Sequence, residues 1–285
     1  LLVRRLRALG GVAIRQQEVI RYEMDEGAVK AVHTREGMCF SGKLFISNVT
    51  PQTTLKQIGS SYFRAAYYDR ILSLPLTVSS FSVHLVVAPH KIPYQAANFY
   101  IHAQEKSTRS FAHFDADDWP NVYMVSMIED QQHKGFAETM TVLTPFKYEE
   151  MALWHDTFHT VSTVDGRGED YEDFKKEVIE RVLRKLEDHL PGIKENIVAC
   201  YASTPLSFRD YIGSEEGSLY GIHRNVKDDL KTTVSTQTKI PNLYFTGQNI
   251  GLHGVLGVTI NAVLTCGNIV GQSYLIRKIK EKKNE

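Results

Sequence analysis

The sequence predicts an α/β protein of mixed α and β structure, in which the two ends of the chain form one domain and the middle forms another. Near the N-terminus, short runs of alternating apolar residues are separated by the turn sequences DEG and REG, which is typical of an antiparallel β-meander. Further strand-like runs in the middle precede a long amphipathic pattern. Residues 240 to 271 then combine a short apolar run, a glycine-rich loop and a helix of small residues.

The N-terminal part begins with an amphipathic run over Leu2 to Leu9, which predicts the end of a helix stopped by Gly10 and Gly11. The strand-like runs after it are Val12 to Ile14 leading into Glu18 to Tyr22, Ala28 to Thr34, and Met38 to Asn48. We expect these runs to form one antiparallel meander that ends at Pro51, because they keep apolar alternation and are rich in β-branched residues.

The middle of the chain has the pattern of a second sheet with a helix. The expected strands, several of them rich in Tyr and Phe, are Phe81 to Ala88, Asn98 to His102, Val122 to Glu129 and Thr139 to Thr144. A helix is predicted over Glu169 to Leu190, with acidic residues in its first turn and its apolar stripe towards the core. A strand over Ile197 to Ala202 and a short helix over Thr204 to Tyr211 follow.

These patterns predict three segments. We expect residues 1–51 to form the first part of one domain, residues 52–196 to form an inserted domain, which a family resemblance identifies as a substrate domain, and residues 197–285 to return to the first domain. The uncharged interval from Ile240 to Ile276 is interrupted by Pro241 and several glycines, so we expect no transmembrane span. Because the chain begins at Leu1 with an arginine-rich run, we expect it to start inside a longer protein.

Composition excludes several classes of function. Lys and Arg number 33 and Asp and Glu number 33, so no net field favours nucleic acid as a partner. Cys39, Cys200 and Cys266 are far apart in the sequence, and no CxxC or HExxH motif is present. We therefore expect no metal site, no disulfide framework and a reducing, cytoplasmic location, with a peripheral membrane contact left open.

The segment from Ile240 to Gly271 is the strongest candidate for a cofactor site. Leu243 to Thr246 predicts a strand, and the glycines at 247, 251, 254 and 257 allow the backbone to come close to a bound group. A helix that starts near Gly254 would direct free N–H groups at a polar or anionic ligand. The alternative is a tight loop packed on its own core. The dinucleotide fingerprint GxGxxG is absent.

Three stretches of this sequence together resemble one enzyme family. They are LxxxGGVAIRQQEVIRYEMDEGAVKAVHTREG…FISNVTP, then STPLSFRDYIGSEEGSLYG, then NLYFTGQNIGLHGVLG. In this order they resemble the phytoene desaturase, carotenoid isomerase and retinol saturase group of FAD-dependent oxidoreductases. The resemblance covers residues 1–51 and 197–275, and the TGQN…GVLG segment is its strongest match.

The resemblance implies a site for FAD. The strand that begins at Val19 would meet the adenine with its backbone. The resemblance places the TGQ segment beside the pyrophosphate and the ribityl chain, and a helix N-terminus at the pyrimidine ring of the flavin; these positions are Gly247, Gln248 and Asn249, followed by Gly254, Val255 and Leu256. Two residues depart from the family's pattern: Asn249 stands where an acid is frequent, and His253 where a proline is common.

The implied activity is hydride transfer between FAD and an apolar unsaturated substrate, such as a carotenoid, a retinoid or another isoprenoid lipid. No side chain is identified as a catalytic acid or base; Tyr211 and Tyr220 are candidates for the surroundings of the substrate or the flavin. We expect the isolated chain to hold FAD weakly and to be inactive. The alternatives are an amine-oxidase-like flavoenzyme and a binding or structural module without catalysis.

Overall fold

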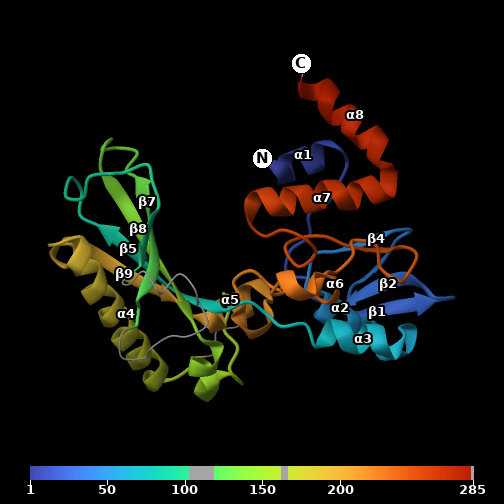
Figure 1. The fold of residues 1–285 in the computed structure, drawn as a ribbon, viewed down its shortest axis with the longest axis horizontal. Coiled ribbons are helices and arrows are strands. Elements are labelled where there is room, and N and C mark those ends of the chain that lie inside the picture. Colours follow the sequence, from blue (N-terminus) through green and yellow to red (C-terminus); the bar gives the residue numbers. More distant parts are fainter. Residues whose placement is uncertain (103–118, 162–165, 284–285) are drawn as a thin grey trace. The chain divides into compact units, whose positions relative to one another are not determined.

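The structure is a computed structural model that describes residues 1–102, 119–161 and 166–283 (Figure 1). Contacts within the chain divide it into two compact units. Unit 1 consists of Leu1–Pro75 and His223–Glu285, and unit 2 consists of Leu76–Ile222. Mixed helices and strands in both units confirm the predicted α/β fold class.

Unit 1 contains the predicted antiparallel meander. After helix α1 (Leu2–Ala8), three strands pair in the order β1-β2-β3; they are β1 (Val19–Asp25), β2 (Ala28–Thr34) and β3 (Cys39–Ser41). Glu26 and Gly27 connect β1 to β2 with φ values of 46° and 80°. Two successive residues with positive φ form the hairpin turn that matches the twist of paired strands, which explains why the DEG sequence predicted the hairpin correctly.

Two parts of the expected meander differ in the structure. Residues 12–14 form no strand in the described part of the chain, and the side chains of Val12 and Ile14 are exposed. The run from Met38 to Asn48 is divided, because its second half forms β4 (Phe45–Ser47), which pairs in parallel with β10 (Leu243–Phe245) as a separate sheet. A long-range partner strand, which periodicity cannot reveal, therefore ends the meander before Pro51.

Helices complete unit 1. They are α2 (Pro51–Ile58), α3 (Ala65–Leu72), α6 (Asp229–Thr232), α7 (Gly254–Val270) and α8 (Gln272–Lys283), with short 3₁₀ turns at Ser60–Tyr62 and Val226–Asp228. The hydroxyl of Thr50 accepts a hydrogen bond of 3.2 Å from the Thr53 N–H, and Pro51 occupies the first turn, so α2 has a favourable start. A buried cluster joins the meander, α2 and β10 through Tyr22, Val29, Ile58, Ile240 and Leu243.

In the residues that the structure describes, unit 2 contains an antiparallel sheet of five strands in the order β6-β7-β8-β5-β9. The strands are β5 (Ser79–Val87), β6 (Phe99–His102), β7 (Val122–Glu129), β8 (Ala137–Phe146) and β9 (Ile197–Ser203). The other elements in the described part of unit 2 are α4 (Glu169–His189), α5 (Pro205–Ile212) and the 3₁₀ turns Tyr148–Trp154, Lys194–Asn196 and Glu215–Gly217. The predicted second sheet is therefore present.

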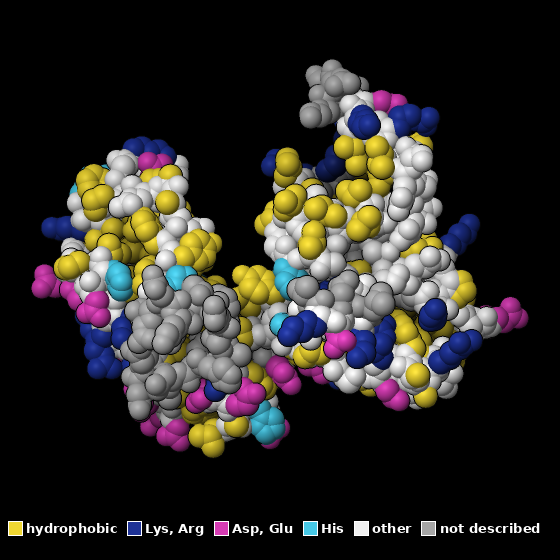
Figure 2. All heavy atoms as spheres, in the orientation of Figure 1, with side chains coloured by type: hydrophobic (Ala, Val, Ile, Leu, Met, Phe, Trp, Pro, Cys, Tyr) yellow, Lys and Arg dark blue, Asp and Glu magenta, His cyan; other side chains and the backbone are white. Residues whose placement is uncertain are grey.

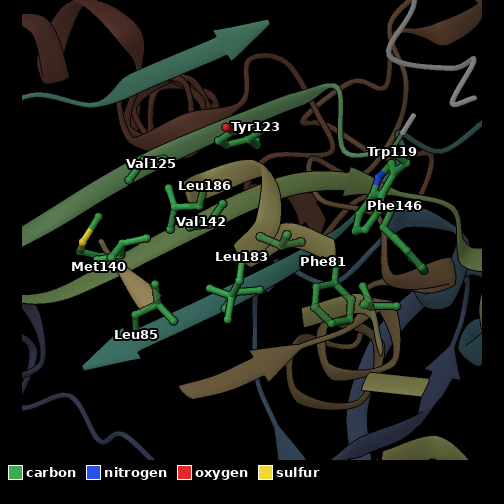
Figure 3. Packing of buried hydrophobic residues seen from close by; sticks show 14 of the residues in the cluster. Phe81, Leu85, Trp119, Tyr123, Val125, Met140, Val142, Phe146, Leu183 and Leu186 are labelled. Carbon is green, nitrogen blue, oxygen red and sulfur yellow. The ribbon is translucent and has the colours of Figure 1, made fainter. Parts of the chain in front are cut away.

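Helix α4 packs its apolar stripe against this sheet. Val178, Val182 and Leu186 are buried in the same cluster as strand residues such as Leu85 and Val142. Figure 3 shows Leu186 directed towards the strands that carry these two residues. The stripe predicted from the sequence thus forms one half of the core of unit 2.

The limits of the two units lie at Pro75 and His223, whereas the sequence placed them near residues 51 and 196. Strand β9 belongs to unit 2 because it pairs along β5, with Ser203 opposite Ser82 and Cys200 opposite Leu85. Among the described residues, no helix is long and apolar enough to cross a membrane.

Replacement of Leu186 by Ala tests the core of unit 2. The Leu186 side chain is 0% exposed, so its truncation leaves a cavity, and we expect a loss of about 2–5 kcal/mol in the free energy of unfolding. The matched control is Leu153→Ala, since Leu153 is 86% exposed, and we expect a change within about 0.5 kcal/mol. Urea unfolding of both variants measures the difference; equal losses would contradict the packing described for α4.

Candidate functional site

The carboxyl ends of β4 and β10 lie side by side in unit 1, because the two strands pair in parallel with Ser47 opposite Phe245. Asn48 and Gly247 follow these ends. Gly247 has a φ of +91°, and a Cβ on it would lie 1.8 Å from the Asn48 side-chain oxygen. Only glycine fits this position, for reasons of both conformation and space. In α/β proteins, ligands bind outside the carboxyl ends of parallel strands, so this edge is the candidate site.

The loop between β10 and α7 is held in place by the buried side chain of Asn261 in α7, which is 1% exposed. Its amide nitrogen donates hydrogen bonds to the carbonyl oxygens of Gly247, at 2.8 Å, and Leu252, at 3.0 Å. A Cβ on Gly251 would lie 2.4 Å from the Asn261 side-chain oxygen. A Cβ on Gly257 would lie 2.6 Å from the carbonyl carbon of Leu252. The glycines therefore allow close packing within the loop itself, as the alternative interpretation expected.

Arg224 binds the same loop from outside it. Its guanidinium donates to the carbonyl oxygens of Ile250 and, at 3.5 Å, of Asn249, and also to the carbonyl oxygen of Thr232. These contacts hold a permanent positive charge beside a loop that carries no acidic or basic residue between 247 and 252. The electrostatic environment of the loop therefore favours a neutral or anionic ligand over a cation.

Helix α7 begins at Gly254, as predicted. Gly254 has a φ of +73° and no atom within 4 Å of an added Cβ, while Val255 and Leu256 are 85% and 74% exposed. The N–H groups in the first turn of a helix lack acceptors within the helix, and its N-terminus carries about half a positive charge. This open helix end can therefore bind a negatively charged or hydrogen-bond-accepting group.

The buried face of α7 is small and polar, and its exposed face is apolar. Gly257, Asn261, Thr265 and Gly267 are buried. The hydroxyl of Thr265 donates a 3.0 Å hydrogen bond to the carbonyl oxygen of Phe245, which fixes the helix to β10. Exposed apolar side chains follow the other face, namely Val255, Leu256, Ile260, Val263, Leu264 and Val270. Figure 2 shows hydrophobic side chains gathered over this part of unit 1.

Val19 is the first residue of β1 and packs partly buried against the cluster that contains Leu243 of β10. Its carbonyl oxygen accepts a 2.7 Å hydrogen bond from the side-chain amide of Gln57 in α2. The same oxygen retains a second lone pair. The structure thus connects Val19 to the strand that precedes the loop, through the packing of one shared cluster.

The other predicted cofactor residues lie in two short runs, residues 247–249 on the loop and residues 254–256 at the start of α7. Asn249 is buried and Gln248 is half-buried, whereas Gly254, Val255 and Leu256 are exposed. All seven positions predicted for the cofactor belong to unit 1.

Tyr211 and Tyr220 belong to unit 2, and both phenol side chains are exposed. Tyr211 lies on α5 and lines a pocket with Arg167, Lys175 and Ser207. The backbone N–H of Tyr220 donates a 2.9 Å hydrogen bond to the hydroxyl of Thr77, which fixes the backbone at this position, while the phenol ring stays exposed on the surface.

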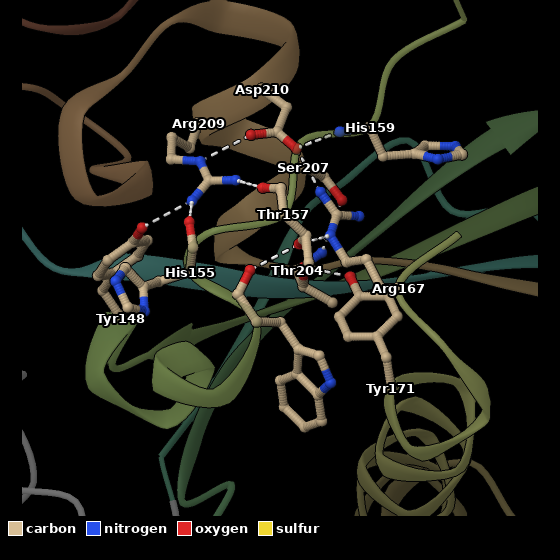
Figure 4. Close-up of polar contacts among 11 residues, drawn as sticks. Tyr148, His155, Thr157, His159, Arg167, Tyr171, Thr204, Ser207, Arg209 and Asp210 are labelled. Carbon is tan, nitrogen blue, oxygen red and sulfur yellow. Dashed lines mark hydrogen bonds and ion pairs between the residues drawn. The ribbon is translucent and has the colours of Figure 1, made fainter. Parts of the chain in front are cut away.

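A buried carboxylate organises the surroundings of this pocket (Figure 4). The Asp210 side chain is 0% exposed and forms ion pairs with Arg167 and, at 2.7 Å, with Arg209. Arg209 also donates hydrogen bonds to the Tyr148 hydroxyl, at 3.1 Å, and to backbone carbonyls of residues 155 and 157. The cluster connects α5 to the segment that precedes α4. Its contacts therefore hold these two parts of unit 2 together.

No protein-family model matches this chain. It is 33% identical over 135 residues to all-trans-retinol 13,14-reductase of Danio rerio, a match that covers 46% of this chain and 21% of that protein. The Homo sapiens protein of the same name is 28% identical over 145 residues, which is 50% of this chain and 23% of that protein. The predicted resemblance to the retinol saturase group is confirmed. The match spans about a fifth of the length of these relatives.

The fold is also shared with a solved structure, putrescine oxidase bound to putrescine. The TM-score is 0.57 at 15% sequence identity, and the alignment covers 98% of this chain and 51% of the oxidase. At this identity the likeness concerns the fold alone.

Two contributions to the site were not predicted from the sequence: the hydrogen bonds of Asn261, and Arg224. A signal for Asn261 did exist, because polar or small residues recur every four positions from Gly257 to Thr265 within an apolar helix. Arg224 is a single arginine in an irregular segment, and nothing in its neighbourhood in the sequence indicates its partners.

The two buried glycines of α7 give a matched test of the close packing at the loop. Gly257→Ala would place its methyl group against the Leu252 backbone, so we expect a loss of about 1–3 kcal/mol in the free energy of unfolding. Gly267→Ala meets the flexible side chain of Gln272 at 3.0 Å, and we expect a change within about 1 kcal/mol. Chemical denaturation distinguishes them; a neutral Gly257→Ala would show that the loop can move away.

Asp210→Asn tests the buried ion pairs of unit 2. The change leaves two arginines without their counter-charge, so we expect a loss of about 3–5 kcal/mol in the free energy of unfolding. The control is Asp173→Asn, whose carboxylate is 71% exposed in its pair with Lys176, with an expected change within about 0.5 kcal/mol. Urea denaturation at neutral pH measures both, and similar small effects would mean that solvent reaches the Asp210 cluster.

Proposed function

We propose that this chain supplies part of a FAD-dependent oxidoreductase of the desaturase, saturase or isomerase type, and that the enzyme acts on an apolar unsaturated lipid such as a retinoid or a carotenoid. The observation that carries the proposal is the arrangement at the carboxyl ends of β4 and β10. There a glycine that cannot be replaced leads into a helix whose first turn is open. The similarity to proteins named all-trans-retinol 13,14-reductase supports the substrate class.

The residues at this edge fit the cofactor. Gly247 has a φ of +91° at the carboxyl ends of the two parallel strands, and this position suits a backbone that lies against a pyrophosphate or a ribityl chain, with Gln248 and Asn249 next to it. Bound FAD would supply the hydride transfer. The N-terminus of α7, at Val255 and Leu256, would stabilise negative charge on the reduced flavin ring, because the helix dipole and free N–H groups are directed there. The Val19 backbone would contact the adenine.

Unit 1 would then hold the cofactor and unit 2 the substrate. Tyr211 and Tyr220 of unit 2 would contact the substrate, and their exposed phenols are available for such a contact. We place the enzyme in a reducing compartment with a peripheral membrane contact. Helix α8 fits such a contact, because the basic residues Arg277 and Lys278 lie next to Ile276, which is exposed.

An amine oxidase is the second candidate, and the observation that favours it is the fold shared with putrescine oxidase. A binding module without catalysis is the third, supported by the packing of the loop on Asn261. Turnover separates the first two, since an enzyme of the proposed type consumes or forms a polyene such as all-trans-retinol and leaves putrescine unchanged. Flavin content separates both from the third.

A charge at the N-terminus of α7 tests the cofactor site. The full-length protein is purified, FAD is added, and bound flavin is measured by absorbance. Leu256→Asp would place a carboxylate near the flavin ring, so we expect FAD affinity to fall by about tenfold, equivalent to about 1.4 kcal/mol, with a lower reduction potential. Leu153→Asp adds the same charge to unit 2 at an exposed position and should change neither value.

A protein that stays colourless after FAD is added would contradict the proposal and favour a module without catalysis. Equal effects of the two aspartate variants would remove α7 from the cofactor site while leaving a flavoenzyme intact.

A further inference from the structure

The meander brings together three side chains that are distant in the sequence. Glu23 on β1, His33 on β2 and Cys39 on β3 each offer one ligand atom, and these atoms lie within 4.8 Å of one another. The Nε2 atom of His33 is 2.8 Å from a carboxylate oxygen of Glu23 and 4.0 Å from the sulfur of Cys39. No metal site was expected from the sequence, because these three residues do not follow the short spacings typical of metal ligands.

Strand pairing explains why these residues meet. His33 lies directly opposite Cys39 in the β2–β3 pair. Glu23 lies opposite Ala31, which is two positions before His33 and therefore on the same face of β2. Diagonal neighbours in an antiparallel pair are within reach of long side chains. The three ligands are thus fixed by the register of one small sheet, and Figure 1 shows β1 and β2 adjacent in it.

The donor set suits zinc. A thiolate, an imidazole and a carboxylate are the ligands that Zn²⁺ takes in proteins, at bond lengths of about 2.3, 2.0 and 2.1 Å respectively. Tetrahedral geometry at these bond lengths separates neighbouring ligand atoms by roughly 3.3–3.6 Å. The distances of 2.8 and 4.0 Å lie on either side of this range. Small rotations of partly exposed side chains would therefore close the site.

Lys30 leaves the metal-facing oxygen of Glu23 available. Its ammonium group is 2.8 Å from Oε1 of Glu23, whereas His33 lies at Oε2. A metal at Oε2 can therefore bind while Lys30 keeps its contact with the other oxygen. Hydrogen bonds from outside the ligand sphere orient carboxylate ligands in this way. Without a metal, Glu23 forms ion pairs with Lys30 and His33 at the surface; with a metal, Glu23, His33 and Cys39 would be its three ligands.

We propose that Glu23, His33 and Cys39 bind one Zn²⁺ ion, with water at the fourth position. The site uses none of the seven positions proposed for the cofactor, although it shares strand β1 with Val19, so zinc binding can be tested apart from the proposed function. A bound ion would connect all three strands and stabilise the folded protein by RT ln(1 + [Zn²⁺]/Kd).

Zinc titration of the reduced full chain, with a chelating dye as competitor, measures the affinity and the stoichiometry. We expect one ion per chain, and a fall in affinity of about tenfold or more for each of His33→Ala and Cys39→Ser. Cys266→Ser is the matched control, because Cys266 is also an exposed free cysteine, and its affinity should equal that of the unchanged protein. Thermal unfolding without zinc checks that each variant remains folded.

Thiol labelling gives a second measurement. Zinc should slow the reaction of Cys39 in the Cys266→Ser variant and leave the reaction of Cys266 in the Cys39→Ser variant unchanged, because a coordinated thiolate is no longer a free nucleophile. The proposal is overturned if the chain binds no zinc, if Cys39→Ser and His33→Ala bind it as tightly as the unchanged protein, or if zinc leaves the labelling of Cys39 unaffected.

Discussion

The parallel pairing of β4 with β10 is the interaction on which unit 1 depends. The side chain of Asn242, just before β10, reinforces this pairing, because its amide group hydrogen-bonds to the backbone of β2 as a neighbouring strand would. Its Oδ1 accepts a 2.9 Å hydrogen bond from the Val29 N–H, and its Nδ2 donates a 2.7 Å hydrogen bond to the Val29 carbonyl. The N–H of Phe45 donates to the Asn242 carbonyl at 2.8 Å. One asparagine therefore aligns the meander, β4 and β10.

The candidate site follows from this alignment. Because the two strands are parallel, Asn48 and Gly247 leave the sheet at the same edge, where only a glycine fits. Thr265 then fixes α7 to the carbonyl of Phe245, and Asn261 holds the loop between them. Hydrogen bonds and the close approach of glycine backbones hold the interior of this site together. Its shape is therefore set by hydrogen-bond geometry more than by apolar burial.

Local patterns predicted the local elements well. The hairpin at Glu26, the stripe of α4 and the start of α7 at Gly254 are each encoded within a few turns or residues of sequence. The division of the run from Met38 to Asn48 was not predicted, because β4 finds its partner at Leu243, far along the chain. The same reason hid Arg224 and the Glu23–His33–Cys39 cluster, whose partners are chosen by register and topology. The resemblance to a family supplied the order of the site residues, which periodicity alone does not contain.

The bond between Val29 and Asn242 joins residues 213 positions apart, whereas unit 2 is one continuous stretch between them. A ribosome adds about 5–20 residues per second, so every strand of unit 2 has been synthesised before Asn242 exists. During that interval β2 lacks the asparagine that completes its hydrogen bonds, and β4 lacks its partner strand. Strands β2 and β4 are therefore synthesised before unit 2 but complete their hydrogen bonds only after it.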